Sequence, residues 1–347
     1  MNTVLLPKVH LHLHLEGAIR PTTLLELYRE QGGANAHLTL EQVMQRAQIT
    51  AQDVTFADFL AKFAFIMPAL RQPEHLVRIT REALADAAAD GVRYVELRFS
   101  PHYIHGYSGL HPFAAIEAVI EGLRQGLAEH PDVEATLTLI IDQARGPEAG
   151  EEAVAWAAHY QGPQTGLNAI DIAGDPSRHP LEAYARACRQ AGDLGLGITV
   201  HAGETQGPAS VRTAIEVLGA SRIGHGIRAV EDPEVLALVV ERQVTLEVSV
   251  SSNVYTNSVP ALAAHPLPRL LEAGVRVTLN TDDPGVFALT LSGEYELLQR
   301  TFGLTLVDFR RANLVAAEAA FLEPQQRVAL RTTIEAGYAA IGGERWT

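Results

Sequence analysis

Short β-rich runs alternate with helical stretches along most of this chain. The strand-like runs are VHLHLH (9–14), RYVELRFS (93–100), EATLTLII (134–141), NAIDIAG (168–174), GITVHAG (197–203), SRIGHG (221–226), TLEVSVSS (245–252) and VRVTLNT (275–281). Several are almost continuously apolar, as expected for strands that are buried on both faces of a parallel sheet. Helical patterns such as PLEAYARACRQAGDLG lie between them and end in glycine, a common helix terminator. Eight strands with helical crossovers predict an α/β fold, the (β/α)8 barrel.

The first connection, from about residue 18 to residue 92, is much longer than the others. Within it Phe56, Phe59, Leu60 and Phe63 have the i, i+3, i+4, i+7 spacing of one helical face. We therefore expect a long helical insertion between the first two strands. A chain of 347 residues suits one such barrel, and the sequence contains no evident linker, repeat or low-complexity tract. We predict a single domain over residues 1–347.

Charge and cysteine content restrict the partners and the chemistry. Lys and Arg total 27 against 41 Asp and Glu, a net charge of −14. A surface this acidic repels phosphate backbones, which argues against nucleic acid but says little about a small, neutral partner. Cys188 is the only cysteine, so no intramolecular disulfide and no zinc site of paired cysteines can form. No signal peptide and no membrane span is recognisable, so we expect a soluble cytoplasmic protein.

Histidines and an acidic residue occupy every second position of the first run. His10, His12 and His14 are followed in the same rhythm by Glu16, and a glycine then breaks the pattern. Alternate strand residues share a face, and functional groups of such barrels lie at the C-terminal strand ends. A lone buried histidine is usually a packing residue, but a His-x-His pair ending a barrel strand indicates metal ligation. His12 and His14 are therefore predicted ligands, and His10 is expected to lie too deep.

Two other strand ends provide further metal ligands. His201 ends the run VHAG, and Asp282 and Asp283 end LNTDD, although DDP is also a typical helix start that one of these carboxylates could cap. Three histidines and one carboxylate fit a catalytic zinc that keeps a position for water. Bound zinc lowers the pKa of water and so supplies a nucleophile.

Such chemistry also needs a proton donor and a group that orients the water. Glu204, just beyond His201, is a candidate donor, and Asp283 is a candidate hydrogen-bond partner. His225, in IGHG, is a candidate water-orienting group, or else a packed histidine between glycines. Three more histidines crowd the loop after residue 100 and are expected at the surface: His102, His105 and His111.

Eight motifs occur in the order seen in adenosine deaminases: HLHLEGA, FLAKF, YVELRFSP, IDIAGD, VHAGE, RIGHG, SSNVYT and LNTDDP. Each motif is weak alone, but the ordered set is specific. The resemblance runs from about residue 7 to beyond residue 320. It implies a zinc-dependent barrel of the amidohydrolase superfamily that converts adenosine and deoxyadenosine to the inosines and releases ammonia.

The resemblance also implies the roles of individual residues. One zinc per chain would be bound by His12, His14, His201 and Asp282. Glu204 would donate a proton to purine N1, and His225 would orient the attacking water and help to deprotonate it. Asp283 would hold that water and make a hydrogen bond with purine N7. The Gly174 N–H would bind N3, Glu16 would grip the ribose beside His14, and the face from Phe56 to Phe63 would form an apolar gate over the base.

Three positions depart from the family pattern. Glu16 stands where adenosine deaminases usually carry aspartate, whereas relatives that act on adenine or aminofutalosine often carry glutamate. Pro176 replaces a glutamate in AGDE, and SVSSN replaces versions with CP or CL before the Ser-Asn pair; neither touches a proposed ligand. RIGHG resembles the adenosine enzymes more than the DHG of adenine deaminases.

Several other functions were compared with adenosine deamination. The main alternative is a deaminase of another 6-aminopurine, adenine or aminofutalosine. A non-catalytic metal-binding barrel predicts a broken functional position, and none is broken. A zinc hydrolase of amides or phosphoesters would typically hold two metals bridged by a strand-end lysine or glutamate, and no strand-end lysine is present. The other zinc deaminase class needs two or three cysteine ligands, which one cysteine excludes.

Overall fold

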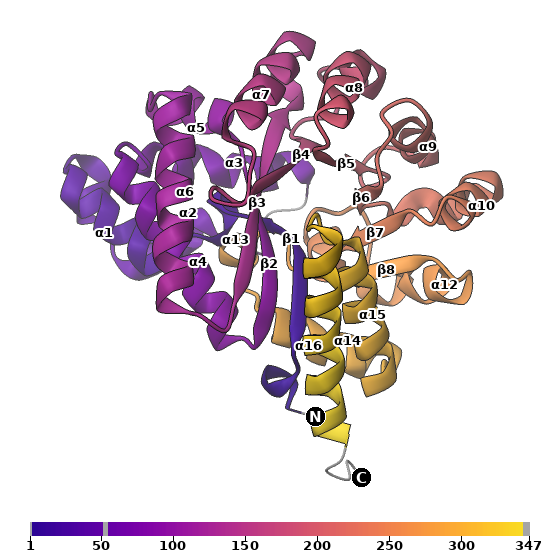
Figure 1. The fold of residues 1–347 in the computed structure, drawn as a ribbon. Coiled ribbons are helices and arrows are strands. Elements are labelled where there is room, and N and C mark those ends of the chain that lie inside the picture. Colours follow the sequence, from indigo (N-terminus) through magenta and orange to yellow (C-terminus); the bar gives the residue numbers. More distant parts are fainter. Residues whose placement is uncertain (1, 51–54, 343–347) are drawn as a thin grey trace.

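The computed structural model describes residues 2–50 and 55–342. Eight parallel strands pair in chain order and form a barrel with helices around it, which confirms the predicted fold (Figure 1). The strands are β1 Lys8–His14, β2 Val92–Phe99, β3 Glu134–Asp142, β4 Leu167–Ala173, β5 Gly197–Ala202, β6 Arg222–His225, β7 Thr245–Val248 and β8 Arg276–Leu279.

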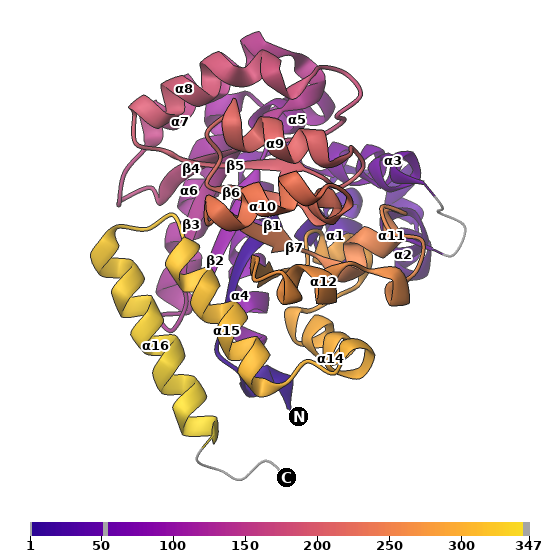
Figure 2. The same ribbon diagram turned by 90° about the vertical axis from the view of Figure 1, so that its right-hand side faces the viewer.

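Helices follow each strand and cover the barrel. They are α1 Pro21–Gln31, α2 Leu40–Ala47, α3 Phe56–Ile66, α4 Pro73–Ala89, α5 Pro101–Ser108, α6 Pro112–Glu129, α7 Pro147–Tyr160, α8 Ala185–Asp193, α9 Pro208–Glu216, α10 Pro233–Glu241, α11 Val250–Tyr255, α12 Leu267–Glu272, α13 Pro284–Phe287, α14 Leu291–Phe302, α15 Leu306–Ala319 and α16 Pro324–Gly342. Many begin with proline, whose missing N–H loses no hydrogen bond at the first helical position. The last two, α15 and α16, lie side by side in both views, and α15 also packs on β1 and β8 (Figure 2).

The first and last strands are joined at the end that carries the histidines. The backbone N–H of His14 donates to the Asp282 carbonyl at 2.9 Å, and the Asp282 N–H donates to the His12 carbonyl at 3.2 Å. These two bonds extend the pairing beyond the end of β8. They bring the residues after β8 directly beside the histidines of β1, although His12 and Asp282 are 270 positions apart in sequence.

The segment between β1 and β2 contains α1 to α4. Helix α3 starts at a capping box, because Thr55 Oγ1 accepts from the Asp58 N–H and Asp58 Oδ2 accepts from the Thr55 N–H. Phe59 and Phe63 are buried, and Phe59 stacks on Phe287 of α13 with ring centres 5.3 Å apart. The helix predicted from the Phe56–Phe63 spacing is therefore present and packs beside the end of β8.

One strand is shorter than the sequence predicts. The run 245–252 was expected to be extended, but β7 ends at Val248 and α11 begins at Val250. The buried carboxylate of Glu294 accepts from the Ser251 N–H at 2.8 Å and bonds the Ser251 hydroxyl as well. Glu294 of α14 thus accepts a hydrogen bond from the first turn of α11. The sequence near residue 250 gives no sign of this distant partner.

The described helices were also compared with the requirements of a bilayer span. None of them, within residues 2–50 and 55–342, is both long enough and apolar enough to cross a membrane.

Candidate active site

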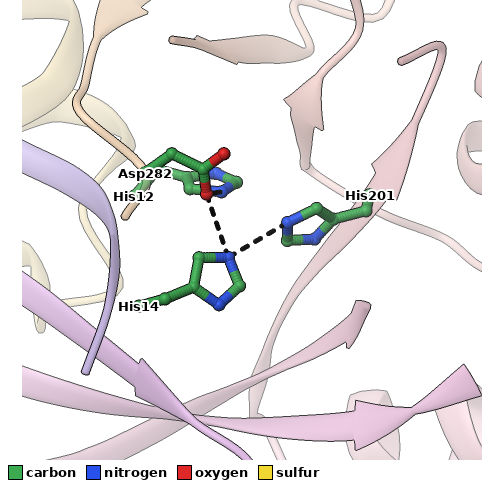
Figure 3. A group of neighbouring side chains, drawn as sticks. All are labelled: His12, His14, His201 and Asp282. Carbon is green, nitrogen blue, oxygen red and sulfur yellow. Dashed lines mark hydrogen bonds and ion pairs between the residues drawn. The ribbon is translucent and has the colours of Figure 1, made fainter. Parts of the chain in front are cut away.

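Four predicted ligands converge at the C-terminal end of the barrel (Figure 3). His12 and His14 come from β1, His201 from β5, and Asp282 follows β8. His14 Nε2 lies 3.3 Å from His201 Nε2 and 3.2 Å from Asp282 Oδ1, and His12 Nε2 lies 3.1 Å from the same oxygen. One ligand atom of each residue lies within 4.8 Å of those of the others. The barrel therefore gathers three imidazoles and one carboxylate around one point.

The spacing and chemistry of this cluster suit a divalent metal. Two ligands ~2.0 Å from a tetrahedral zinc are about 3.3 Å apart, which matches the separations above. Burial, followed by the charge of Arg98, lowers the pKa of His12, and burial lowers the pKa of His14 to about 4. Neutral imidazoles then direct lone pairs at one another and at Asp282. Lone pairs and a carboxylate this close repel unless a cation lies among them.

Two of the histidines are held from behind by buried carboxylates. His12 Nδ1 donates to Glu247 at 2.8 Å, and His201 Nδ1 donates to Asp171 at 3.0 Å. Such bonds fix the ring and leave Nε2 free for a metal. Burial alone would lower the pKa of His201, but the charge of Asp171 raises it.

A buried arginine links the two supporting carboxylates. Arg98 of β2 donates to Asp171 at 2.7 Å and to Glu247 at 2.8 Å, and all three side chains are fully buried. Our sequence reasoning missed these residues. The signal was present, because a charged residue inside an apolar strand must find a buried partner to offset its desolvation.

Glu204 lies in the same pocket as the cluster. Its buried carboxylate accepts a hydrogen bond from Thr256 Oγ1 at 3.2 Å, and Oε2 lies 3.8 Å from His225 Nε2. Burial, followed by the negative charge of Asp282, raises the pKa of Glu204 to about 7. A carboxyl group with this pKa holds its proton for much of the time near neutral pH, as a proton donor requires.

Two residues that line the pocket have a left-handed backbone conformation, which orients their side chains. His225, the last residue of β6, has φ 64°, and Asp282 has φ 67°. Left-handed conformations at non-glycine residues cost of order 1–3 kcal/mol and persist only where the surroundings enforce them. His225 Nε2 lies 3.8 Å from Asp282 Oδ2 and faces the pocket. The imidazole of His225 therefore points toward the four candidate metal ligands but is not one of them.

Asp283 is placed by a close approach to the first strand end. A Cβ on Gly17 would lie 1.6 Å from Asp283 Oδ1, so only glycine fits there. Asp283 precedes α13 but its side chain makes no capping hydrogen bond, and its buried Oδ1 has no partner. Burial, followed by the charge of Asp282, raises the pKa of Asp283 well above its usual value. The capping alternative is therefore wrong, and Asp283 lines the pocket instead.

Glu16 and Gly174 lie at another side of the pocket. Glu16 is not part of β1 but begins the 3-10 helix Glu16–Ala18, because the strand ends at His14. Its Oε1 accepts from the Ser100 N–H at 2.7 Å, and burial raises its pKa to about 7. Gly174 follows β4 with φ 111°, and a Cβ there would lie 3.0 Å from Asp142 Oδ1. The Glu16 carboxyl group and the Gly174 backbone are therefore both part of the pocket lining.

The pocket lining combines apolar and acidic side chains. The apolar ones include four residues of α3, namely Phe56, Phe59, Leu60 and Phe63. The acidic ones are Glu16, Asp142, Asp175, Glu204, Asp282 and Asp283, and no lysine or arginine is among the described lining residues. A flat, uncharged ring with polar edges suits such a wall better than an anion does.

Several histidines are not part of this site. His10 accepts from the Thr281 N–H at 3.1 Å and lies outside the ligand group, as its deeper position suggested. The expectation of a surface position is wrong for His102, which is buried, bonds Glu152 at 3.1 Å and packs on Trp156. Both partners belong to α7, which is distant in sequence. His105 and His111 are exposed, as expected.

Comparison with known proteins agrees with this geometry. The family model for adenosine deaminase matches residues 7–337. Adenosine deaminase from Klebsiella pneumoniae (strain 342) is 39% identical over 333 residues, which cover 96% of this chain and 98% of that relative.

Solved structures show the same fold. The adenine deaminase from Arthrobacter aurescens has a TM-score of 0.87 and 25% identity, covering 95% of this chain and 98% of that one. An amidohydrolase from Burkholderia ambifaria, with bound zinc, has a TM-score of 0.89 and 27% identity, covering 98% and 93%. With a full-length family match and a close curated relative, the chain belongs to the adenosine deaminase family.

Proposed function

We propose that this enzyme hydrolyses adenosine and 2′-deoxyadenosine to inosine and 2′-deoxyinosine, with release of ammonia. Water adds at purine C6 and the amino group leaves as ammonia after taking up a proton. The observation that carries this proposal is that Glu204 lines one pocket with His14, His201 and Asp282, three of the four candidate metal ligands. A proton donor beside a metal cluster is the pairing that hydrolysis of an amino-substituted ring requires.

The resident metal is zinc, one per chain, held by His12, His14, His201 and Asp282. When bound, zinc would lower the pKa of water and so provide a strong nucleophile near neutral pH. Zinc favours imidazole and carboxylate ligands in tetrahedral sets, and the 3.1–3.3 Å separations among these side chains support that choice.

The remaining groups bind and polarise the purine. Glu204 donates a proton to N1, which makes C6 more electrophilic, and His225 orients the attacking water. N7 carries no hydrogen, so it needs a donor, and the protonated carboxyl of Asp283 can supply one. The Gly174 N–H faces N3. The apolar side of α3 then covers the base and excludes water.

An acidic, cation-free wall favours a nucleoside over a nucleotide. Six acidic side chains and no lysine or arginine line the described pocket, so no basic side chain there would offset the charge of a phosphate. Glu16 and His14 are placed to bind ribose hydroxyls, which are neutral. The substrate we propose is therefore an uncharged purine nucleoside.

A substrate panel tests this function directly. Loss of absorbance at the purine band is followed with adenosine, deoxyadenosine, adenine, adenosine monophosphate and aminofutalosine, and kcat/KM is compared. The two nucleosides are expected to give the highest values and the monophosphate a much lower one. No turnover of any 6-aminopurine by the zinc-loaded protein would contradict the proposal.

Asp282 and Asp283 are expected to differ although they are neighbours. Asp282→Ala should lose zinc and activity together, because its oxygen is part of the ligand cluster. Asp283→Ala should keep zinc but lose rate, and Asp283→Asn should lose less, because the amide can still donate to N7. Metal analysis and kcat are measured on each variant. Equal zinc loss in Asp282→Ala and Asp283→Ala would show that their roles are wrongly divided.

Glu16 is expected to make the enzyme prefer nucleosides over the free base. Its carboxylate is fixed by the Ser100 N–H and can accept from the ribose. A mispaired buried carboxylate costs about 1–3 kcal/mol. Adenosine should therefore exceed adenine by at least about tenfold in kcat/KM, equivalent to ~1.4 kcal/mol.

The Glu16→Ala variant separates this role from a structural one. It should narrow the adenosine-to-adenine ratio mainly through adenosine and should leave the zinc content unchanged. If adenine is the better substrate of the unaltered enzyme, the alternative function, deamination of adenine or a related 6-aminopurine, is correct. The glutamate itself and the likeness to an adenine deaminase structure are the observations that favour this alternative.

A further inference from the structure

His225 has two ring nitrogens in different surroundings. Nδ1 lies 3.0 Å from the side-chain amide nitrogen of Asn253 in α11, and Nε2 faces the pocket, 3.8 Å from Glu204 Oε2. A neutral imidazole carries its proton on only one of these nitrogens, so either Nε2 donates to the pocket or it accepts a proton there. The positions of the ring atoms alone do not decide between the two tautomers.

The backbone N–H of Leu267 determines the tautomer of His265, and His265 in turn determines that of His225. The Leu267 N–H points at His265 Nδ1, 3.1 Å away, and a backbone N–H can only donate. His265 Nδ1 must therefore accept, and the proton of the neutral ring lies on Nε2. Burial lowers the pKa of His265 to about 4, so the ring is neutral near pH 7.

The proton on His265 Nε2 in turn determines which way the side-chain amide of Asn253 is oriented. His265 Nε2 lies 3.2 Å from Asn253 Oδ1 and donates to it. The opposite atom of the amide is then the nitrogen, which has hydrogens only to donate, and it donates to His225 Nδ1. Asn253, His265 and His225 are each at most 3% exposed, so water does not compete for these bonds.

We propose that Asn253 and His265 are positioning residues that hold His225 in the tautomer with its proton on Nε2. The tautomer follows from the hydrogen bonds alone, whereas its use in catalysis rests on the proposed function. His225 then presents a donor to the pocket and holds the attacking oxygen through one lone pair. In this tautomer the neutral ring cannot take a proton at Nε2, so His225 orients the water and another group accepts its proton.

The tautomer can be read directly by nuclear magnetic resonance. The zinc-loaded full-length enzyme is labelled with ¹⁵N-histidine, and long-range ¹H–¹⁵N spectra separate protonated from unprotonated ring nitrogens. The signals of His225 are identified by their loss in His225→Gln. We expect a proton on Nε2 and none on Nδ1. A proton on Nδ1 of His225 in the unaltered enzyme would overturn the proposal.

Asn253→Asp reverses the polarity with little change of shape. The new carboxylate still accepts from His265 Nε2, but an oxygen now faces His225 Nδ1 and should draw a proton there. We expect kcat to fall by at least about tenfold with KM within about twofold and zinc retained; in a serine protease a wrong histidine tautomer lowers kcat by about 10⁴. An unprotonated His225 Nδ1 in this variant, or an unchanged kcat, would contradict the proposal that Asn253 sets the tautomer of His225.

Two further variants separate positioning from folding. His265→Phe removes the anchor and should give a mixture of His225 tautomers with reduced kcat, and His265→Gln, which keeps a donor, should recover part of the rate. Asn313→Asp is the matched control, because Asn313 is also a buried amide but bonds Val9, Tyr295 and Tyr338 away from the pocket. It should change stability and leave the His225 spectrum unchanged.

These measurements also separate this inference from the proposed function. If adenosine is not deaminated but His225 carries its proton on Nε2, the proposed function is wrong and the proposed tautomer is correct. If adenosine is deaminated but His225 Nδ1 is protonated, the proposed function is correct and the proposed tautomer is wrong.

Discussion

His201→Ala is expected to lose most of its zinc and nearly all of its deaminase activity. His201 Nε2 lies 3.3 Å from His14 Nε2 and belongs to the cluster that can hold the metal. Loss of a residue that only supports a ligand typically lowers metal affinity or activity about 10–100-fold, so loss of a ligand should lower it at least about 100-fold. Metal content per chain and zinc affinity are measured beside kcat. His12→Ala should behave in the same way.

Matched variants show whether the loss is specific. His10→Gln changes a buried histidine of the same strand that lies outside the cluster, and its amide oxygen can still accept from the Thr281 N–H. This variant should keep one zinc per chain. Asp171→Asn weakens the support of His201 and should lower zinc affinity about 10–100-fold. Full zinc retention in His201→Ala or His12→Ala would refute the ligand assignment.

Glu204→Gln is expected to lower kcat by about 10²–10⁴, the contribution typical of a general acid. Glutamine has nearly the same shape and can still make a hydrogen bond to N1, but it cannot transfer a proton. Zinc content and melting temperature should stay close to those of the unaltered enzyme, because Glu204 is not among the clustered ligands. The measurement is kcat with saturating adenosine, together with metal analysis and a thermal melt.

Glu294→Gln is the control for this change. Glu294 is also a buried carboxyl group whose pKa is raised by burial, but it bonds Ser251 and does not line the pocket. Glutamine can keep an acceptor toward the Ser251 N–H, so kcat should change by less than about threefold, within the scatter of a modest packing change. If Glu204→Gln keeps more than half of the activity, Glu204 is not the proton donor.

The periodicity of the chain predicted most of the architecture. Strands buried on both faces are recognisable because nearly every residue is apolar, and the helices between them are marked by glycine and proline at their ends. Errors occurred where the deciding partner is distant in sequence. The run 245–252 stops being a strand at Val248 because Glu294 satisfies the N–H of Ser251. Glu16 leaves the strand rhythm because β1 ends at His14.

The sequence predicted which four candidate ligands the barrel brings together, but not the charges and hydrogen bonds around them. His12, His14, His201 and Asp282 are identifiable because they stand at strand ends, where a parallel barrel gathers its functional groups. Whether Asp283 caps a helix or faces the pocket was open in the sequence. It was decided by Gly17, which lets the carboxyl approach the end of β1 closely; burial, followed by the charge of Asp282, then raises the pKa of that carboxyl.

By itself, the sequence determined the barrel, the order of its strands, the residue types of the candidate metal site and the family, because these depend on local periodicity and on motifs within a few residues. Only the tertiary structure decided which groups support and tune the site. Arg98, Asp171 and Glu247 meet behind the histidines, and Leu267 orients His225 through His265 and Asn253. The physical reason is that proton positions and buried charges depend on distances between side chains from different strands, and those distances exist only after the barrel closes.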